Sequence, residues 1–466
     1  MGAGVYRRDV SKQIPTRKVG AVIMRFLNAF TAYRLPRTAT APFCPSEVRG
    51  AVAVAGGAPW FTRFRAVAGN GLLVAIGYMD PGNWATDIEA GSRFGYGLLW
   101  VVALASLIGM LLQDICVRLG IASGLDLAQL CRREHGRWTN LLLWALAEVA
   151  IIACDIAEVV GTALALSLLF GWPLEAGVLV TAFDTVLVLL LQGAGVRRLE
   201  AIIGALMITV AVCCGINVWL VQPDWLAVAG GLVPHPALLN DGKALYLALG
   251  ILGATVMPHN LYLHSSLVGT RCATGDPAVQ RDFLRLSSWD SALSLGAAFL
   301  VNAALLVLAA AAFHAHGETG VTEIQDAHRL LAPLVGSGAA AVLFAVALLA
   351  CGQSSTITGT IAGQVILEGF LGLKIPCWIR RLITRGLAIV PAFLAVHWAG
   401  VEGIGRVLVA TQVVLSLQLP FALVPLLRFA GNRRIMGAYV MPLWQRCAGW
   451  LVLGLIVVAN GWLLLG

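Results

Sequence analysis

Residues 71–100 read GLLVAIGYMDPGNWATDIEAGSRFGYGLLW, an apolar stretch interrupted by the four residues DPGN that begin at Asp80. Residues 248–268 read ALGILGATVMPHNLYLHSSLV and are interrupted in the same way by MPHN, which begins at Met257. Proline removes a backbone donor and clashes with the preceding helical turn, so both stretches are expected to break near their middle. Backbone that leaves the helical conformation is tolerated inside a bilayer only where protein buries it or where it lines a cavity. Each break therefore predicts a buried site.

The composition places the chain in a lipid bilayer. Of its 466 residues, 59% are hydrophobic and 12% are charged, whereas a soluble domain is about half apolar and about a quarter charged. The mean hydropathy of +0.84 agrees with this placement. The ten cysteines form no CxxC pair and no zinc-type spacing. We therefore interpret those inside apolar stretches as small buried hydrophobic residues.

The apolar stretches predict an all-α integral membrane protein with eleven transmembrane helices of about 20 residues or more. The two interruptions fall in spans one and six. Each is the first span in a set of five. This correspondence predicts two inverted repeats of five helices, residues 64–221 and 244–427, and one extra helix at 444–465. An ordinary proline kink explains either break alone, but not the pair. The predicted spans are 64–84 with its continuation, 97–121, 139–169, 174–192, 198–221, 244–268, 289–313, 338–371, 382–398, 403–427 and 444–465.

Basic residues alternate between the two ends of these spans. With the N-terminus in the cytoplasm, most Lys and Arg residues after the leader fall at cytoplasmic ends or loops, as the positive-inside rule requires. They are Arg118, Arg132, Arg133, Arg137, Arg197, Arg198, Arg271, Arg281, Arg285, Lys374, Arg380, Arg381, Arg385, Arg428, Arg433, Arg434 and Arg446, against Arg93, Lys243, Arg329 and Arg406 outside. Eleven spans then leave the C-terminus outside. The net charge of +8 needs no nucleic-acid partner.

The start of the chain differs from the rest. Residues 1–60 are predicted to be a basic cytoplasmic tail, partly disordered, and residues 61–466 a single transmembrane domain. Such a basic tail can contact anionic lipid. No short apolar region with a small-residue cleavage site follows the early arginines, so the tail is not interpreted as a cleavable signal.

Polar groups beside the two breaks form a candidate cation site. Asp80 is a carboxylate at membrane depth, and such a residue is a functional hypothesis by default. Asn83 offers an amide oxygen beside it, and the breaks free backbone carbonyl groups. Met257 adds a thioether, which calcium and magnesium use poorly and which manganese(II), iron(II), cobalt and cadmium accept. Alone, Met257 would be interpreted as core packing; its position before a helix-breaking proline gives it weight.

Three acids lie on one face of the third span. Glu148, Asp155 and Glu158 are spaced by seven and three residues, which brings them onto one side of a helix. Arg380, Arg381 and Arg385, at the start of span nine, are candidates to pair with them. This pattern fits a proton route through the membrane, and it fits a structural salt-bridge network equally well.

Other polar residues within the spans carry less information. His259 and His264 are five residues apart, ~140° around a helix, so they do not chelate one ion from one helix face. His259 is interpreted as a proton acceptor, and His264 as either a proton acceptor or a structural hydrogen-bonding group. Gln412 and Asn302 are single amides in spans ten and seven, and each is weak evidence alone.

Five stretches together resemble the Nramp family of proton-coupled divalent metal transporters, whose bacterial members take up manganese and iron. They are DPGNWATDIEAGSRFGYGLLW from Asp80, AEVAIIACDIAEVVGTALAL from Ala147, GATVMPHNLYLHSSL from Gly253, GQSSTITGT from Gly352 and QVVLSLQLPFALVPL from Gln412. The resemblance covers about residue 66 to the end of the chain. Its most specific part is the DPGN and MPHN pair.

The resemblance implies a leucine-transporter-like fold of eleven helices, with helices one and six unwound around the metal. At matching positions Asp80, Asn83 and Met257 would supply side-chain ligands. Ala254 would supply a backbone carbonyl, and Gly77 would do so when the site faces inward. Many members have Ala where Gly77 stands, which leaves ligation by the carbonyl possible.

The resemblance also implies roles for residues farther along the chain. Gln412 resembles a glutamine of helix ten that closes on the metal in an occluded state. The residues that match the family's proton pathway, together with the second histidine of helix six, are His259, Asp155, Glu158, Glu148, Arg380, Arg381 and His264.

The sequence thus predicts secondary active uptake of manganese, iron(II), cadmium and cobalt by alternating access, coupled to protons. The metal is the transported substrate, no cofactor and no obligate protein partner are inferred, and the excess of Arg over Lys indicates a GC-rich bacterium and its inner membrane. The alternative is a sodium-coupled organic-solute symporter of the same fold, which needs no thioether. An intramembrane metalloenzyme would need clustered histidines or an HExxH motif, and the sequence has neither.

Overall fold

The computed structural model describes residues 52–54, 59–192, 196–235, 238, 240–273, 277–372, 377–400 and 403–465. For some residues within these ranges, Arg380 and Arg381 among them, it describes the backbone only. The predictions made for the basic tail before residue 52 lie outside the described residues. Residues 42–466 form one compact unit by themselves.

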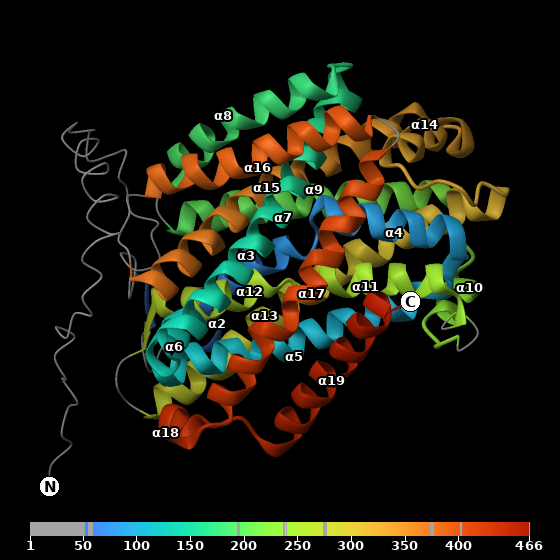
Figure 1. The fold of residues 1–466 in the computed structure, drawn as a ribbon. Helices are drawn as coiled ribbons and strands as arrows, with labels where there is room; N and C mark the ends of the chain where they lie inside the picture. Colours follow the sequence, from blue (N-terminus) through green and yellow to red (C-terminus); the bar gives the residue numbers. More distant parts are fainter. Residues whose placement is uncertain are drawn as a thin grey trace, which may run out of the picture. The chain divides into compact units, whose positions relative to one another are not determined.

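Figure 1 shows that the described chain is built almost entirely of helices that run alongside one another. The helices are α2 (Trp60–Val67), α3 (Asn70–Gly77), α4 (Pro81–Phe94), η1 (Gly95–Leu98), α5 (Leu99–Ser123), α6 (Leu127–Glu134), α7 (Arg137–Phe170), α8 (Leu174–Gln192), α9 (Val196–Val221), α10 (Trp225–Gly231), α11 (Gly242–Thr255), α12 (Pro258–Leu267), η3 (Val268–Thr270), α13 (Pro277–Ala312), η4 (His314–His316), α14 (Ile324–Val335), α15 (Gly338–Leu371), α16 (Cys377–Ala399), α17 (Ile404–Ala430), α18 (Arg433–Met436), η6 (Gly437–Tyr439) and α19 (Leu443–Leu465).

Every predicted span coincides with helical chain: the first with the end of α2, α3 and α4, the sixth mainly with α11 and α12, and each of the others mainly with one long helix. Among the described residues, eight helical segments are long and apolar enough to cross a membrane, and two apolar stretches, Leu174–Phe183 and Gly386–Trp398, are shorter. The all-α expectation holds for the spans, and eleven crossings stay a prediction. The structure adds one small parallel strand pair that the sequence analysis missed, β1 (Val52–Val54) with β2 (Arg271–Ala273).

Both predicted breaks are present, and the two prolines start helices rather than kink them. Helix α3 ends at Gly77 and α4 begins at Pro81, with Asp80 in an extended conformation as its N-cap. Helix α11 ends at Thr255 and α12 begins at Pro258. Proline suits the first position of a helix because its missing N–H would be unpaired there in any case. Each of these two spans therefore consists of two half-helices joined by a short non-helical segment, called the open backbone below.

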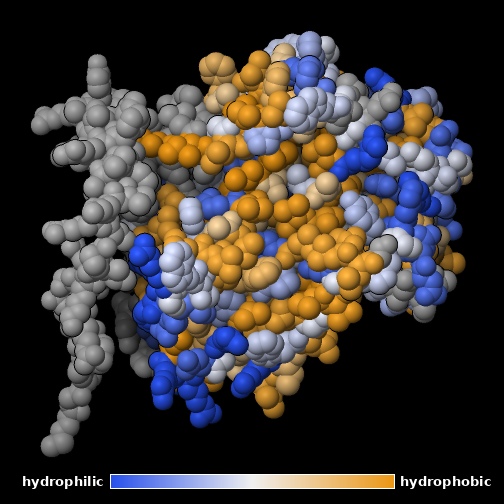
Figure 2. Space-filling view, in the orientation of Figure 1, coloured by the Kyte–Doolittle hydropathy of each residue, from blue (hydrophilic) through white to orange (hydrophobic). Residues whose placement is uncertain are grey.

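The surface has the distribution of a membrane protein. Figure 2 shows hydrophobic residues across the middle of the molecule and hydrophilic residues towards its ends. Many large apolar side chains are exposed, including Leu107 at 62%, Phe183 at 73% and Leu451 at 72%. Water would penalise such a surface, whereas lipid accommodates it. The interior is filled by α7 and α15, which pack along each other, with α9 against α15 and α17 against α7.

Candidate metal site

Asp80 lies in the gap between α3 and α4 and is fully buried. Its Oδ1 accepts hydrogen bonds from the backbone N–H of Asn83 at 2.9 Å and from the Asn83 side-chain amide at 2.8 Å. The first bond caps α4, because the N-cap side chain satisfies an N–H that has no partner within the helix. A bond between near neighbours in the sequence therefore holds the Asp80 carboxylate in place. Its other oxygen, Oδ2, faces α17.

Asn83 connects the two broken helices. Its Nδ2 donates to the carbonyl oxygen of Ala254 at 3.0 Å, near the end of α11. The predicted ligands Asp80, Asn83 and Ala254 are therefore brought together around one amide group. Met257, which caps α12, is also fully buried and packs with Cys154 and Leu415.

Gln412 of α17 approaches the same carboxylate. Its Nε2 lies 3.4 Å from Asp80 Oδ2, and its Oε1 has no hydrogen-bond partner among the described residues. The approach depends on Gly82, because a Cβ at that position would lie 1.7 Å from Gln412 Nε2. The glycine of DPGN thus makes room for a side chain from a helix far along the chain.

Gly77 is the last residue of α3 and lies against Asn260 of α12. A Cβ at residue 77 would meet Asn260 Nδ2 at 2.4 Å, and both amide atoms of Asn260 are without hydrogen-bond partners in the described chain. Glycine at this position therefore allows the two half-helices to approach closely. An alanine here would require Asn260 to move.

Two residues of the site were not identified from the sequence. Asn302 of α13 donates to the carbonyl of Tyr78 at 2.7 Å and lies 3.4 Å from Asn83 Oδ1. The thiol of Cys351, from α15, donates to the carbonyl of Met79. Both therefore hold the open backbone before Asp80. The only signal in the sequence was a polar residue inside an apolar span, which does not say what it faces.

The candidate site mixes ligand types. Among the described residues, no group of three His, Cys, Asp or Glu side chains is placed to hold a metal ion. The donors that do converge are one carboxylate, side-chain amides and a backbone carbonyl, with a thioether from the adjoining cap. Such a set suits a transported ion, because an ion that must leave again needs weaker holding than a structural metal.

A short chain of polar groups leads away from the second break. His259 Nε2 lies 3.8 Å from Cys154 Sγ, and this sulfur lies 3.6 Å from Glu158 Oε1. All three residues are buried, and so is Asp155, which lies on α7 with Cys154 and Glu158. The structure thus brings both His259 and Glu158 close to one thiol. Cys154 is more than the hydrophobic filler that its setting in the sequence suggested.

Two of the other predicted proton-pathway residues, Glu148 and His264, form hydrogen bonds with residues outside this chain of groups. Glu148 is partly exposed and accepts a hydrogen bond from the Trp144 indole at 3.0 Å. His264 Nδ1 lies 2.9 Å from Gln113 Oε1, and Gln113 donates to the Tyr78 hydroxyl at 3.0 Å. His264 thus has the structural hydrogen bond that one of the two interpretations required. The side chains of Arg380 and Arg381 lie outside the described residues.

A buried ion pair lies at the start of α3. Arg271 Nη2 bonds Glu200 Oε1 at 2.6 Å and also donates to the carbonyl of Ala68 at 3.0 Å. Asp290 accepts from the backbone N–H groups of Gly69, at 3.2 Å, and Gly71, at 2.7 Å. The sequence placed Arg271 at one face of the membrane without indicating its burial. Together these bonds attach the beginning of the first broken helix to α9 and α13.

Comparison with protein families identifies a match over most of the chain. Residues 71–466 match the family model Nramp, described as natural resistance-associated macrophage protein-like. A protein of Pseudomonas aeruginosa named divalent metal cation transporter MntH 1 is 58% identical over 428 residues, which cover 92% of this chain and 98% of that protein. Divalent metal cation transporter MntH of Ralstonia nicotianae is 55% identical over 429 residues, 92% and 97% of the two chains.

Solved structures extend the comparison to the fold. A manganese transporter of Eremococcus coleocola superposes with a TM-score of 0.83 at 38% sequence identity, covering 90% of each chain. Mhp1, a nucleobase-cation-symport-1 family transporter, superposes with a TM-score of 0.59 at 14% identity, covering 91% of this chain and 92% of that one. MhsT in complex with L-phenylalanine gives 0.58 at 13% identity, covering 84% and 98%. The leucine-transporter-like fold is therefore confirmed.

Proposed function

Because the chain belongs to the Nramp family, it is a transporter of divalent metal cations and not an enzyme, and we propose that its cargo is manganese(II) and iron(II). The observation that carries this proposal is the convergence of Asp80, Asn83 and the Ala254 carbonyl between two broken helices. The manganese transporter of similar structure and the two relatives named for divalent metal cations support it.

The donor types support a choice among divalent ions. Asp80 supplies a negative charge and Ala254 a carbonyl oxygen, which any hard cation would accept. Met257 supplies a thioether, which manganese(II), iron(II), cobalt and cadmium accept more readily than magnesium or calcium. We propose that Gly77 contributes its carbonyl when the site faces inward, and that Gln412 closes the site from α17.

Metal binding requires Asn83 to change its orientation. Its Nδ2 faces Asp80 and Ala254, while its Oδ1 faces Asn302. A cation placed between the carboxylate and the carbonyl would repel an amide N–H and attract an amide oxygen. We propose that the amide rotates by about 180° when the ion enters, so that its oxygen faces the ion in place of the N–H groups.

Transport follows the alternating-access scheme of this fold. The four half-helices α3, α4, α11 and α12 surround the site, and α4 packs against α11, α13 and α17. We propose that they rock against the remaining helices to open the site to one side at a time. A negative-inside potential of 100 mV favours entry of a divalent ion by about 4.6 kcal/mol, twice the value for one charge.

Proton coupling is proposed to use the chain of groups beside the site. Cys154 Sγ lies within 4 Å of both His259 and Glu158. These groups adjoin the metal site because Cys154 and Met257 belong to one packed apolar cluster. Asp155 extends the acidic side of this route. Glu148, Arg380 and Arg381 remain predictions from the family resemblance for the same route, and His264 remains a prediction from the sequence pattern.

The chain is a multi-pass membrane protein, and we propose the bacterial inner membrane as its location. The two relatives named above are bacterial proteins. The distribution of Lys and Arg favours a cytoplasmic N-terminus and, with eleven crossings, an external C-terminus.

The decisive experiment measures manganese uptake by proteoliposomes. Asp80→Ala is expected to abolish uptake, because the only charged ligand is lost. Asp241→Ala is the matched control, since Asp241 also caps a helix, α11, but is exposed and outside the site. Equal uptake by wild type and Asp80→Ala would overturn the assignment. Calorimetric titration with manganese and cadmium separates the metal proposal from an organic-solute symporter, which would give no specific heat with either ion.

A further inference from the structure

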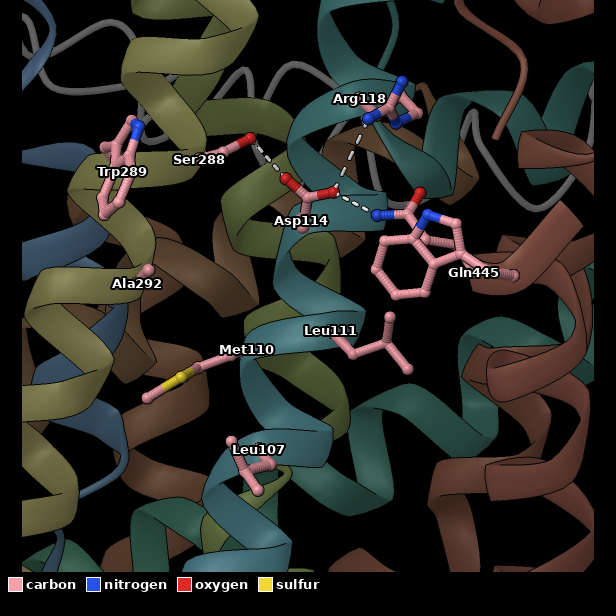
Figure 3. Close-up of a pocket in the computed structure, with 10 residues that line it drawn as sticks. Leu107, Met110, Leu111, Asp114, Arg118, Ser288, Trp289, Ala292 and Gln445 are labelled. Atoms are coloured by element: carbon pink, nitrogen blue, oxygen red, sulfur yellow. Dashed lines mark hydrogen bonds and ion pairs between the residues drawn. The ribbon is translucent and has the colours of Figure 1, made fainter. Parts of the chain in front are cut away.

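A crevice of about 540 Å³ opens on the membrane-facing surface between α5, α13 and α19. None of its lining residues belongs to the candidate metal site, and it has no part in the transport scheme. Its walls change character along α5: Leu107, Met110 and Leu111 line one end, and Asp114 and Arg118 line the other. Figure 3 shows this gradient, with the apolar side chains at the bottom and the polar group at the top. The crevice is therefore amphipathic.

The carboxylate at the polar end is already fully engaged. Asp114 Oδ1 accepts from the Ser288 hydroxyl, and Oδ2 accepts from Gln445 Nε2 at 2.6 Å. These bonds connect α5 to α13 and α19 and build the closed end of the crevice. The ion pair from Asp114 to Arg118 is long, at 3.8 Å. Arg118 Nε has no hydrogen-bond partner in the described part of the chain, so the guanidinium keeps donors for another group.

Two further arginines lie close in sequence to residues that line this end. Arg285 is one turn before Trp289 on α13, and Arg446 follows Gln445 at the start of α19. Both are exposed, and neither forms an ion pair within the described residues. Arg118 lines the crevice, and Arg285 and Arg446 add two positive charges close in sequence to lining residues of α13 and α19. The excess of positive charge favours an anionic ligand, and basic pockets between membrane helices bind anionic phospholipid headgroups.

The dimensions fit one leaflet of a bilayer. Arg118 and Leu107 are eleven residues apart on α5, which is about 16 Å along a helix. Half of the hydrocarbon thickness is about 15 Å. Trp289 and Trp444, which are 60% and 64% exposed, line the crevice. Tryptophan is enriched where the headgroups of a membrane begin.

We propose that this crevice is a binding site for an anionic phospholipid. The phosphate contacts Arg118, with Arg285 and Arg446 around it, and one acyl chain lies along Leu111 and Leu107. The occupant is a lipid rather than free phosphate, because most of the lining is apolar. This proposal stands on the membrane setting of the chain and is independent of which metal is transported.

The test measures lipid retained by the purified protein. Wild type and variants are incubated in detergent with phosphatidylglycerol or phosphatidylcholine, washed, and analysed by native mass spectrometry. Wild type is expected to retain phosphatidylglycerol preferentially. Arg118→Gln is expected to reduce this preference about fivefold, the effect of one basic residue near anionic lipid. Arg428→Gln is the matched control, an exposed arginine in the last turn of α17 that does not line the crevice.

A second variant probes the apolar part independently. Ala292 lines the crevice from α13, and Ala292→Phe is expected to displace the acyl chain and remove retained lipid of both kinds. Equal retention of the two lipids by wild type would overturn the proposal, as would unchanged retention by both variants. A change in oligomeric mass in place of a change in lipid would also overturn it, because the occupant would then be a second copy of the chain. The arginine variant alters only a partly exposed side chain, so it keeps the test valid if Ala292→Phe misfolds.

Discussion

The side-chain amide of Asn83 lies 3.0 Å from the backbone carbonyl of Ala254, which joins the two broken helices by one hydrogen bond. The same nitrogen bonds Asp80 at 2.8 Å. The amide therefore lies between a carboxylate from the first broken helix and a carbonyl from the second, where the proposed cation would bind. If the ion binds here as proposed, its entry would displace this contact between the two broken helices.

Replacing Asn83 tests that relation. Asn83→Ala removes an amide oxygen from the proposed ligand set and also removes the bond to Ala254. We expect manganese affinity to fall by about 100-fold, at the upper end of losses seen for groups near a metal. Calorimetric titration of the purified variant measures this. Affinity within a factor of two of wild type would exclude Asn83 as a ligand.

Replacing the thioether tests ion selectivity. Met257→Leu keeps the volume of a fully buried side chain and removes the sulfur, so the packing cost is below about 1.5 kcal/mol. We expect cadmium binding to weaken and calcium or magnesium to compete with manganese in uptake assays. Met79→Leu is the control, because Met79 is also buried and adjoins Asp80. Selectivity that changes equally in both variants would show that packing, not ligation, is responsible.

Removing Asn302 tests a residue that positions the open backbone. Asn302→Ala deletes the donor to the Tyr78 carbonyl, and we expect manganese affinity to fall by about 10-fold because the segment before Asp80 loses its support. Asn140→Ala is the matched control, since Asn140 also donates from a membrane helix to a backbone carbonyl, that of Phe370, at 2.9 Å. A loss of stability without a loss of affinity in Asn302→Ala would reduce its role to packing.

Adding one methyl group at Gly77 tests the contact between the half-helices. Gly77→Ala places a Cβ at 2.4 Å from Asn260 Nδ2, and such overpacking costs about 1–3 kcal/mol. We expect a lower thermal midpoint in detergent. In the background of Asn260→Ala, the same change is expected to be tolerated because the clashing atom is gone.

The control for this pair is Gly215→Ala. Residue 215 lies within α9, and a Cβ there meets nothing within 4 Å, so alanine is expected to be neutral or slightly stabilising. If Gly77→Ala lowered the midpoint equally with and without Asn260, the clash would not be the cause.

Stability is expected to depend on pH through Glu323, outside the spans. Burial raises the pKa of Glu323 from 4.5 to about 7, although the backbone N–H of Gly405 donates to its Oε2 at 2.5 Å. Between these two pH values the folded protein holds a proton that the unfolded chain releases. Stability therefore falls as pH rises from about 4.5 to about 7.

Thermal midpoints between pH 5 and 8 check this dependence. Glu323→Gln is expected to flatten the curve and to raise the midpoint at pH 8. Glu318→Gln, at an exposed position of the same loop, is expected to follow wild type. A wild-type midpoint that rises with pH over this window, relative to Glu323→Gln, would contradict the expected direction.

The chemistry of single residues determined where the first and sixth spans break. Proline cannot continue the preceding helix, and in both cases it begins the next one, at Pro81 and Pro258. Asp80 caps its own helix through a bond to Asn83, three residues away. These features depend on neighbours in the chain, so the sequence alone predicts them. The alternation of Lys and Arg is also local, and the topology that follows from it stays a prediction.

Only the tertiary structure decided which distant residues reach the break. Asn302 and Gln412 are single amides in apolar spans, and their own surroundings in the sequence do not say which way they face; only the family resemblance placed Gln412 at the metal. Packing turns one toward the Tyr78 carbonyl and the other toward Asp80. The reason is physical: the direction of a side chain from a membrane helix depends on how that helix rotates and packs against its neighbours. Such contacts depend on how side chains of different helices fit together, and they decide which residues surround the candidate metal site.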